Sequence, residues 1–502
     1  MTGVKTVSLV AVSFGAQTLV SVIFYLVIAR TLPVTEVGAI ALFLSLEAIF
    51  FTIFSLNLDT GFIHFISYFQ EKNSIESIPR KFILLSVLTI IFSLTSISAA
   101  SGIIATVFFH SIEYEAVVNL LGIFVAETIG IGYLVSFLQG MQHFSLAAIA
   151  NLLYSLFSMG IAIVLSLFSC SIFEISSGFV VGGAFTLLLA VIFVKAAEVD
   201  GKEPDLKLPT FFRYVIPIYL GSLFSGLMAT VDRIILPALT NLTLSAVYTY
   251  SLTIATIVTA MTSPFSFFIL PKISQHFAVN PEEGIKKYGL SSLELFYYLA
   301  LPVSIGGAII SKPLLSFLVG GIYAKQYQVL QIMIFSYAFF SVRPILSSML
   351  LGVRKTGVYL WSGIGAFAAN LSISILFIPH YGIYGAITAS ISAWAVSTLP
   401  RMIAVNRLAN VHISIWPYIR IWINTGIMAL AVIFLFRFVF YGNSGLFPTV
   451  VSGILIYLAI SRINIPFSIT TLDVFKEIVS RRNRILFVVL RLLFGIKNIV
   501  SI

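Results

Sequence analysis

Apolar positions along this chain come in long, continuous runs that are separated by short polar turns. The runs lack the alternating pattern of an outer-membrane barrel strand. A helix that crosses a bilayer needs about 20 mostly apolar residues, and about 14 runs meet this length. They lie at 7–29, 38–58, 82–109, 116–138, 145–168, 173–195, 213–236, 243–263, 288–310, 327–350, 357–378, 383–405, 415–440 and 446–461. The pattern therefore predicts an all-α membrane protein with about 14 transmembrane helices.

Composition supports this class. Of the 502 residues, 59% are hydrophobic and 10% are charged, whereas a soluble domain carries about 25% charged residues. This excludes a soluble enzyme, a nucleic-acid-binding domain and a secreted disulfide scaffold. The single cysteine, Cys170, cannot form an internal disulfide. The first apolar run is long enough to span and lacks a small-residue cleavage site, so we expect no cleaved leader.

The positive charge is unevenly distributed between the turns. With the N-terminus in the cytoplasm, most of the 29 basic residues fall on the inner side, including those from Arg462 onward. Such a bias predicts an even number of spans and both termini in the cytoplasm. The net charge of +10 then reflects orientation in a plasma (inner) membrane, and we expect no nucleic-acid partner.

The polar stretches divide the chain into five parts. We predict a six-helix lobe, a cytoplasmic linker, a second six-helix lobe, two additional helices and a basic amphipathic tail, at 1–195, 196–212, 213–407, 408–465 and 466–502. We expect the tail to lie on the inner leaflet against anionic lipid. The alternative is a tail that only fixes the topology.

Two pairs of short motifs recur at nearly one spacing. The turn around Gly140 resembles that around Gly352, and the start of the second span around Gly38 resembles that around Ala246. This favours two parallel six-helix halves related by a pseudo-two-fold repeat, an arrangement common in transporters.

Five motifs, in order along the chain, resemble the polysaccharide flippases of the multidrug/oligosaccharidyl-lipid/polysaccharide exporter superfamily. The family's Ala-Arg ending of span one, its Asp-x-Gly, its Asp-Arg before an apolar pair, its Val-Tyr and its Pro-x-Tyr-Gly-x-x-Gly-Ala signature match residues 29–38, 59–61, 232–235, 247–248 and 377–386. The first turn departs from the pattern, since Leu32-Pro33 lacks the family's glycine.

The resemblance implies a transporter without cofactors rather than an enzyme. Its substrate would be a polyprenyl-diphosphate-linked oligosaccharide, moved from the inner to the outer leaflet by alternating access for cell-surface polysaccharide biosynthesis. Each sugar hydroxyl that enters hydrocarbon unpaired costs about 4–8 kcal/mol, so a polar path is needed. O-antigen of lipopolysaccharide, capsule and archaeal glycan stay open as products, as do contacts with glycan-synthesis enzymes and membrane lipids.

Polar residues at helical spacing mark candidate faces of this path. They are Gln17, Ser21 and Tyr25 in span one; Ser222, Ser225 and Asp232 in span seven; Thr249, Thr253, Thr256 and Thr259 in span eight; and Ser336, Arg343 and Ser347 in span ten. The alternative is that serine and threonine only mediate close helix packing.

Carboxylates within spans are the candidates for proton coupling. Glu47 and Glu127 lie near the middle of spans two and four, and Asp232 lies in span seven. A charge at the bilayer centre costs about 2.5–3.5 kcal/mol and usually faces water or a partner. The alternatives are glutamates bonded across the helix bundle and an Asp232 that pairs with another helix.

Arginines are the candidates for binding a diphosphate, since the planar guanidinium makes paired hydrogen bonds. The candidates are Arg30, Arg233 and Arg343, with Gln17 as a polar substrate contact. Arg30 and Arg233 could instead extend to the membrane interface. Pro302 and Pro344 fall within spans and could kink them.

Two rival functions stay open. A multidrug or small-cation exporter of the same superfamily would favour an acidic cavity. A membrane-embedded glycan polymerase or glycosyltransferase would need a sizeable outer loop, and the outer loops here are short. The sequence has no phosphate-binding Gly-x-x-x-x-Gly-Lys loop, and its six histidines have no metal-ligand spacing, so we predict no metal site.

Overall fold

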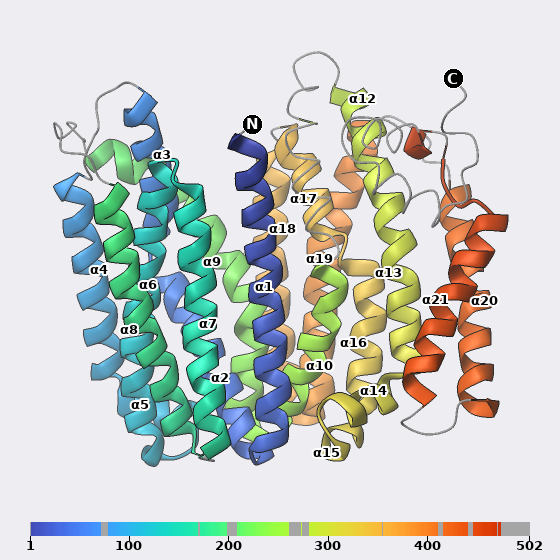
Figure 1. Cartoon of the computed structure of the whole chain (residues 1–502), viewed down its shortest axis with the longest axis horizontal. Coiled ribbons are helices and arrows are strands. Elements are labelled where there is room, and N and C mark those ends of the chain that lie inside the picture. Colours follow the sequence, from blue (N-terminus) through green and yellow to red (C-terminus); the bar gives the residue numbers. More distant parts are fainter. Residues whose placement is uncertain are drawn as a thin grey trace. The chain divides into compact units, whose positions relative to one another are not determined.

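The computed structural model describes residues 2–71, 79–168, 171–197, 208–260, 273, 281–353, 355–409, 415–439, 445–468 and 470–472. Every regular element in these ranges is a helix (Figure 1), which confirms the all-α prediction. The predicted tail from residue 473 onward and most of the predicted linker, at 198–207, lie outside the described residues.

The chain divides into two compact units, which we describe separately. Unit 1 comprises Met1–Thr249 and Ile373–Ala386, and unit 2 comprises Tyr250–Ser372 and Ile387–Ile502. The lobe boundaries expected from the sequence stay a prediction.

Among the described residues, unit 1 contains the first ten helical segments and parts of three others. They are α1 (Thr2–Thr31), α2 (Val34–Phe54), α3 (Leu58–Glu71), α4 (Arg80–Ala99), α5 (Ser101–Phe108), η1 (Ile112–Tyr114), α6 (Glu115–Gly140), α7 (Phe144–Phe168), α8 (Ile172–Ala197) and α9 (Leu208–Leu239). The start of α10 (Leu242–Ala260), the end of α18 (Thr356–Tyr381) and the start of α19 (Ile383–Ala409) also belong to this unit, while α10 from Tyr250 onward belongs to unit 2.

Unit 2 contains the remaining helices. They are α12 (Pro281–Gly284), the π-helical η2 (Ile285–Leu290), α13 (Ser291–Ile309), α14 (Ser311–Leu318), α15 (Gly321–Ala324), α16 (Tyr327–Phe340), α17 (Arg343–Gly352), most of α18 and α19 (Ile383–Ala409), α20 (Trp416–Phe438) and α21 (Leu446–Ile463).

Each predicted span coincides with a helix or a pair of helices. Among the described residues, twelve helical segments are long and apolar enough to cross a membrane. The other two predicted spans correspond to α1, of 30 residues, and α19, of 27 residues. This chain is therefore a multi-pass membrane protein.

The structure breaks two of the predicted spans and, among the described residues, adds short helices between spans, among them α3, α14 and α15. The span at 82–109 is divided at Ala100 between α4 and α5, and the span at 327–350 is divided just before Arg343. Pro344 accounts for the second break, because it lies in the first turn of α17 and has no backbone N–H to bond the preceding turn. The unpredicted α3 is too short to span and packs against α6 and α9.

In unit 1, α6 packs against α3, α4 and α8, while α7 packs between α1 and α8. Aromatic rings fill the space between these helices. Phe43 of α2 stacks on Phe124 of α6 and on Phe179 of α8, with ring centroids 5.9 and 6.0 Å apart. These contacts hold together the helices that surround the cavity described below.

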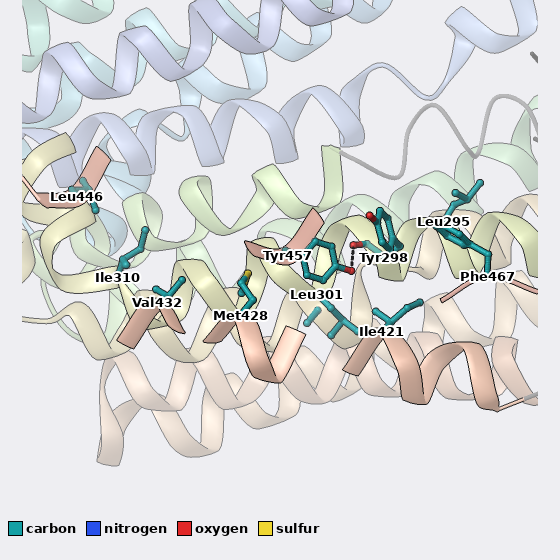
Figure 2. Packing of buried hydrophobic residues seen from close by; sticks show 11 residues of the cluster. Leu295, Tyr298, Leu301, Ile310, Ile421, Met428, Val432, Leu446, Tyr457 and Phe467 are labelled. Carbon is teal, nitrogen blue, oxygen red and sulfur yellow. Dashed lines mark hydrogen bonds between the residues drawn. The ribbon is translucent and has the colours of Figure 1, made fainter. Parts of the chain in front are cut away.

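In unit 2, a row of buried apolar side chains joins α13 to α20 and α21 (Figure 2). Tyr457 of α21 donates a hydrogen bond from its hydroxyl to the carbonyl oxygen of Tyr298 of α13, at 2.8 Å. The two additional C-terminal helices are therefore an integral part of this unit's core.

Glu294 of α13 holds the segment that follows α21. Its side chain is buried, and Oε2 accepts hydrogen bonds from the Ser468 backbone N–H at 3.0 Å, the Ser468 hydroxyl at 2.9 Å and the Thr471 hydroxyl at 2.6 Å. This intramembrane carboxyl group was not among the predicted candidates. Its donors show that it serves packing.

The first sequence motif marks a close helix contact. Gly38 of α2 lies against the backbone at the start of α10, so that a Cβ atom at this position would come within 1.8 Å of the Leu242 carbonyl oxygen. Two residues earlier, Glu36 accepts a hydrogen bond from the backbone N–H of Ile172, at 2.9 Å, and thus caps α8. The motif joins three helices of unit 1.

Asp232 makes a second contact of this kind. It is buried in α9, and Tyr248 of α10 donates a short hydrogen bond from its hydroxyl to Oδ2. This bond joins two helices, as the packing alternative for Asp232 expects. Its assignment to proton coupling stays a prediction.

We predict that Gly38→Ala lowers the free energy of unfolding by about 1–3 kcal/mol, because the methyl group must displace helix backbone. The matched control is Gly160→Ala in α7, where nothing lies within 4 Å of the added Cβ. Thermal unfolding in detergent, followed by size-exclusion chromatography, measures both. Equal midpoints for the two variants would contradict the close contact.

We also predict that Tyr248→Phe destabilises unit 1 by about 1–3 kcal/mol, since it removes a donor from a buried carboxyl group. The control is Tyr381→Phe, which removes the hydroxyl of an exposed ring in the same unit. The same thermal measurement applies. A Tyr248→Phe midpoint equal to that of the control would show that the bond to Asp232 contributes nothing.

Candidate functional site

A cavity of about 470 Å³ lies within unit 1, among α1, α2, α6, α7 and α8. Polar side chains from four of these helices line it: Ser21, Tyr25, Glu47, Thr128, Asn151, Tyr154, Ser155 and Ser158. The structure thus brings two members of the predicted stripe on span one together with the predicted carboxylate Glu47. The cavity thus combines apolar walls with a carboxyl group, an amide and several hydroxyl groups, which can bond a hydroxyl-rich substrate or a proton.

Glu47 is the acidic group of this cavity. Its side chain is half-buried in α2, and the Thr128 side chain lies within hydrogen-bonding range of its carboxyl group. Tyr154 of α7 is in electrostatic range of both Glu47 and Glu127. The two predicted carboxylates therefore belong to one neighbourhood.

Glu127 lies on α6 immediately before Thr128 and points toward α8. A Cβ atom at Gly183 would come within 2.3 Å of its Oε2, so the glycine makes room for the carboxyl group. Within the described part of the chain, this oxygen is buried and has no hydrogen-bond partner. A carboxyl group without a fixed partner can exchange a proton without breaking a salt bridge.

The other candidates of unit 1 lie around the cavity rather than in it. Arg233 of α9 is in electrostatic range of the cavity residue Tyr25, and its Nε is buried without a partner among the described residues. Gln17 is half-buried and Arg30 is exposed at the end of α1; neither lines the cavity. Asp232 is bonded to Tyr248 instead.

Unit 2 contains a cluster of two arginines. Arg401 of α19 is buried; its Nε donates to the Ser362 hydroxyl at 2.8 Å and one terminal nitrogen donates to the Ser347 hydroxyl at 2.7 Å. Its guanidinium lies 4.8 Å from the centre of the Tyr359 ring. The predicted Arg343 is near enough for the two positive charges to repel each other.

The sequence interpretation missed Arg401, because it assigned this residue to the basic inner turns. The structure instead buries it on α19, where hydroxyl groups from α17 and α18 satisfy it. Serines on other helices are not visible in a hydropathy profile, so only tertiary packing distinguishes Arg401 from an orientation charge.

The polar face of α7 was also missed, although its signal is present in the sequence. Asn151, Tyr154, Ser155 and Ser158 recur at helical spacing within one span and all line the cavity. As for metals, the described residues contain no group of three or more histidine, cysteine or acidic side chains that could hold an ion.

Solved structures show the same fold at low sequence identity. A structure titled lipid II flippase MurJ, in an inward closed conformation, matches with a TM-score of 0.72 and 17% identity, covering 91% of this chain and 98% of that chain. An inward-facing multidrug resistance MATE family transporter of the MOP superfamily matches with a TM-score of 0.63 and 14% identity, over 79% and 96% of the two chains.

A third structure, a MOP superfamily transporter from Pyrococcus furiosus, matches with a TM-score of 0.53 and 14% identity, over 80% of this chain and 95% of that chain. All three of these solved structures are described as flippases or transporters. No curated protein sequence matches this chain.

A family model described as "Polysaccharide biosynthesis protein" matches residues 4–277, which is more than half of the chain. The matched range includes the motifs around Gly38, Asp59, Asp232 and Tyr248 on which the resemblance was based. The chain therefore belongs to the polysaccharide biosynthesis protein family.

Proposed function

We propose that this protein is a flippase that moves a polyprenyl-diphosphate-linked oligosaccharide from the inner to the outer leaflet by alternating access. It acts in cell-surface polysaccharide biosynthesis, and no covalent bond is made or broken. The observation that carries the proposal is the Arg343–Arg401 cluster of unit 2. Its Arg401 is satisfied by hydroxyl groups, so that its charge is available to an anion.

The chemistry of the two units suits the two polar parts of such a substrate. The unit 1 cavity offers hydroxyl, amide and phenol groups, which can replace water around sugar hydroxyls. Guanidinium groups suit a diphosphate because they form paired, charge-assisted hydrogen bonds. The lipid tail can stay in the bilayer throughout.

We further propose the orientation expected from the basic turns, with both termini in the cytoplasm and the protein in the plasma membrane. Positive residues of short turns are retained on the cytoplasmic side. In this orientation the ends of α18 and α19 that carry Lys355 and Arg407 lie at the inner leaflet, where the substrate is made.

One observation favours the second candidate, a small-cation or multidrug exporter. Glu47 makes the unit 1 cavity acidic, as a cation carrier would require. The paired arginines of unit 2 oppose it, because they would repel a cation from that unit. A flippase accounts for both features if the carboxylates serve proton coupling, whereas an exporter leaves the arginines unexplained.

We predict that Arg343→Gln reduces flipping about tenfold or more, and that Arg343→Lys does not restore it, because lysine lacks the paired hydrogen bonds. A deletion strain complemented with each variant tests this, with lipid-linked oligosaccharide on the inner leaflet as the readout. The control is Arg437→Gln, an exposed arginine at the end of α20. If the deletion strain is sensitive to drugs and has normal glycans, the flippase proposal is wrong and the exporter is favoured.

For coupling, we propose that Glu47 and Glu127 bind the transported proton; Asp232 is the third candidate, although its bond to Tyr248 favours a packing role. We predict that Glu47→Gln and Glu127→Gln remove the stimulation of flipping by an imposed proton gradient. Reconstituted vesicles at a series of external pH values measure this. The control is Glu113→Gln, which neutralises an exposed carboxyl group. Full rate and an unchanged pH response in both variants would exclude proton coupling through these residues.

A further inference from the structure

A groove of about 790 Å³ lies on the surface of unit 2, between the start of α18 and the end of α19. Its walls are apolar and its side chains face outward: Trp361 is 71% exposed, and Leu399 and Ile403 are each 53% exposed. In a membrane-spanning helix pair, such a surface faces hydrocarbon chains. The groove can therefore hold an apolar chain along its length.

Two basic residues stand at the same end of the groove. Lys355 precedes the first residue of α18, and Arg407 lies in the last turn of α19. Both side chains are exposed, and neither forms a hydrogen bond or ion pair with any described residue. No acidic side chain lines the groove. The end of the groove is thus a place for a negatively charged group.

A third cation lies behind the groove wall. Ser362 lines the groove, and its hydroxyl accepts the hydrogen bond from Nε of the buried Arg401. Arg401 in turn lies close to Arg343. Positive charge therefore continues from the groove's entrance into the cluster to which we assign the diphosphate.

We propose that the α18–α19 groove binds the prenyl diphosphate portion of the lipid-linked substrate, with the diphosphate on Lys355 and Arg407 and the prenyl chain along Trp361, Leu399 and Ile403. The inference rests on the proposed function. It adds a substrate-loading site that is separate from the unit 1 cavity.

Charge decides between this occupant and an ordinary membrane phospholipid. A diphosphate diester carries a negative charge on each of its phosphates, whereas a phosphodiester lipid such as phosphatidylglycerol carries a single charge. The two cations at the entrance pair with no described residue, and with Arg401 behind them they match the more highly charged group. Since each charge-assisted contact strengthens binding, the groove should prefer the diphosphate.

The test measures binding of undecaprenyl diphosphate to the full-length protein in phosphatidylcholine nanodiscs, by native mass spectrometry. We expect the double substitution Lys355→Gln with Arg407→Gln to weaken binding about tenfold or more. The matched control is Lys195→Gln with Arg213→Gln, which removes a lysine and an arginine that are exposed on unit 1. Because all four residues are exposed, both double variants should fold, which their thermal midpoints without lipid confirm.

Two further measurements identify the occupant. Trp361→Ala should weaken the binding of undecaprenyl diphosphate more than that of dimethylallyl diphosphate, because a five-carbon chain is too short to reach Trp361, about 9 Å along α18 from Lys355. Phosphatidylglycerol at equal concentration should not displace undecaprenyl diphosphate. Unchanged binding by the Lys355/Arg407 double variant would overturn the proposal, and displacement by phosphatidylglycerol would replace it with a general anionic-lipid site.

Binding and flipping separate this inference from the function on which it rests. Normal glycans in a deletion strain would contradict the proposed function. Specific binding in the groove could still be measured in that case. Conversely, a double variant that binds undecaprenyl diphosphate as tightly as the native protein overturns the groove assignment even if flipping is established.

Discussion

Hydrocarbon offers no hydrogen-bond partners, so every polar group of this protein must be satisfied by the protein itself. Many serine and threonine hydroxyl groups donate to a carbonyl oxygen one turn earlier in their own helix, as Ser45 does to Ala41 at 2.7 Å and Thr186 does to Gly182 at 2.9 Å. Buried charged groups need several hydrogen bonds. Glu294 and Arg401 each form theirs with residues far away in the sequence. Under this constraint, a buried atom of a charged group that has no hydrogen-bond partner among the described residues, such as Oε2 of Glu127, is a candidate for function.

The same constraint explains why the spans could be predicted from the sequence. A run of about 20 apolar residues has no stable place except across a bilayer, and each predicted run corresponds to helix. The breaks within spans were harder to locate, because both sides of a break are equally apolar. At Pro344 a break loses little hydrogen bonding, since proline has no backbone N–H group. The short α3 was missed because its packing on α6 and α9 depends on tertiary contacts, not on hydropathy.

The candidate site could be predicted only in part for a related reason. A charge that is rare within a span can be found from its position, which identified Glu47, Glu127 and Arg343. Whether it faces a cavity or a bonded partner depends on other helices. Asp232 and Glu47 look alike in the sequence, yet Tyr248 bonds the former and the latter lines a cavity. Arg401 looked like one of many orientation charges.

The way in which Arg401 is satisfied bears directly on function. A carboxylate partner would satisfy its donors and cancel its charge, leaving little attraction for a passing anion. Two serine hydroxyls accept its hydrogen bonds and an aromatic ring packs against its guanidinium group, but none of these neutral groups cancels the positive charge. Because Arg343 adds a second positive charge nearby, an anion at this cluster would offset the repulsion between the two guanidinium groups. Under the proposed function, a diphosphate that reaches both arginines in only one conformation would shift the equilibrium toward that conformation.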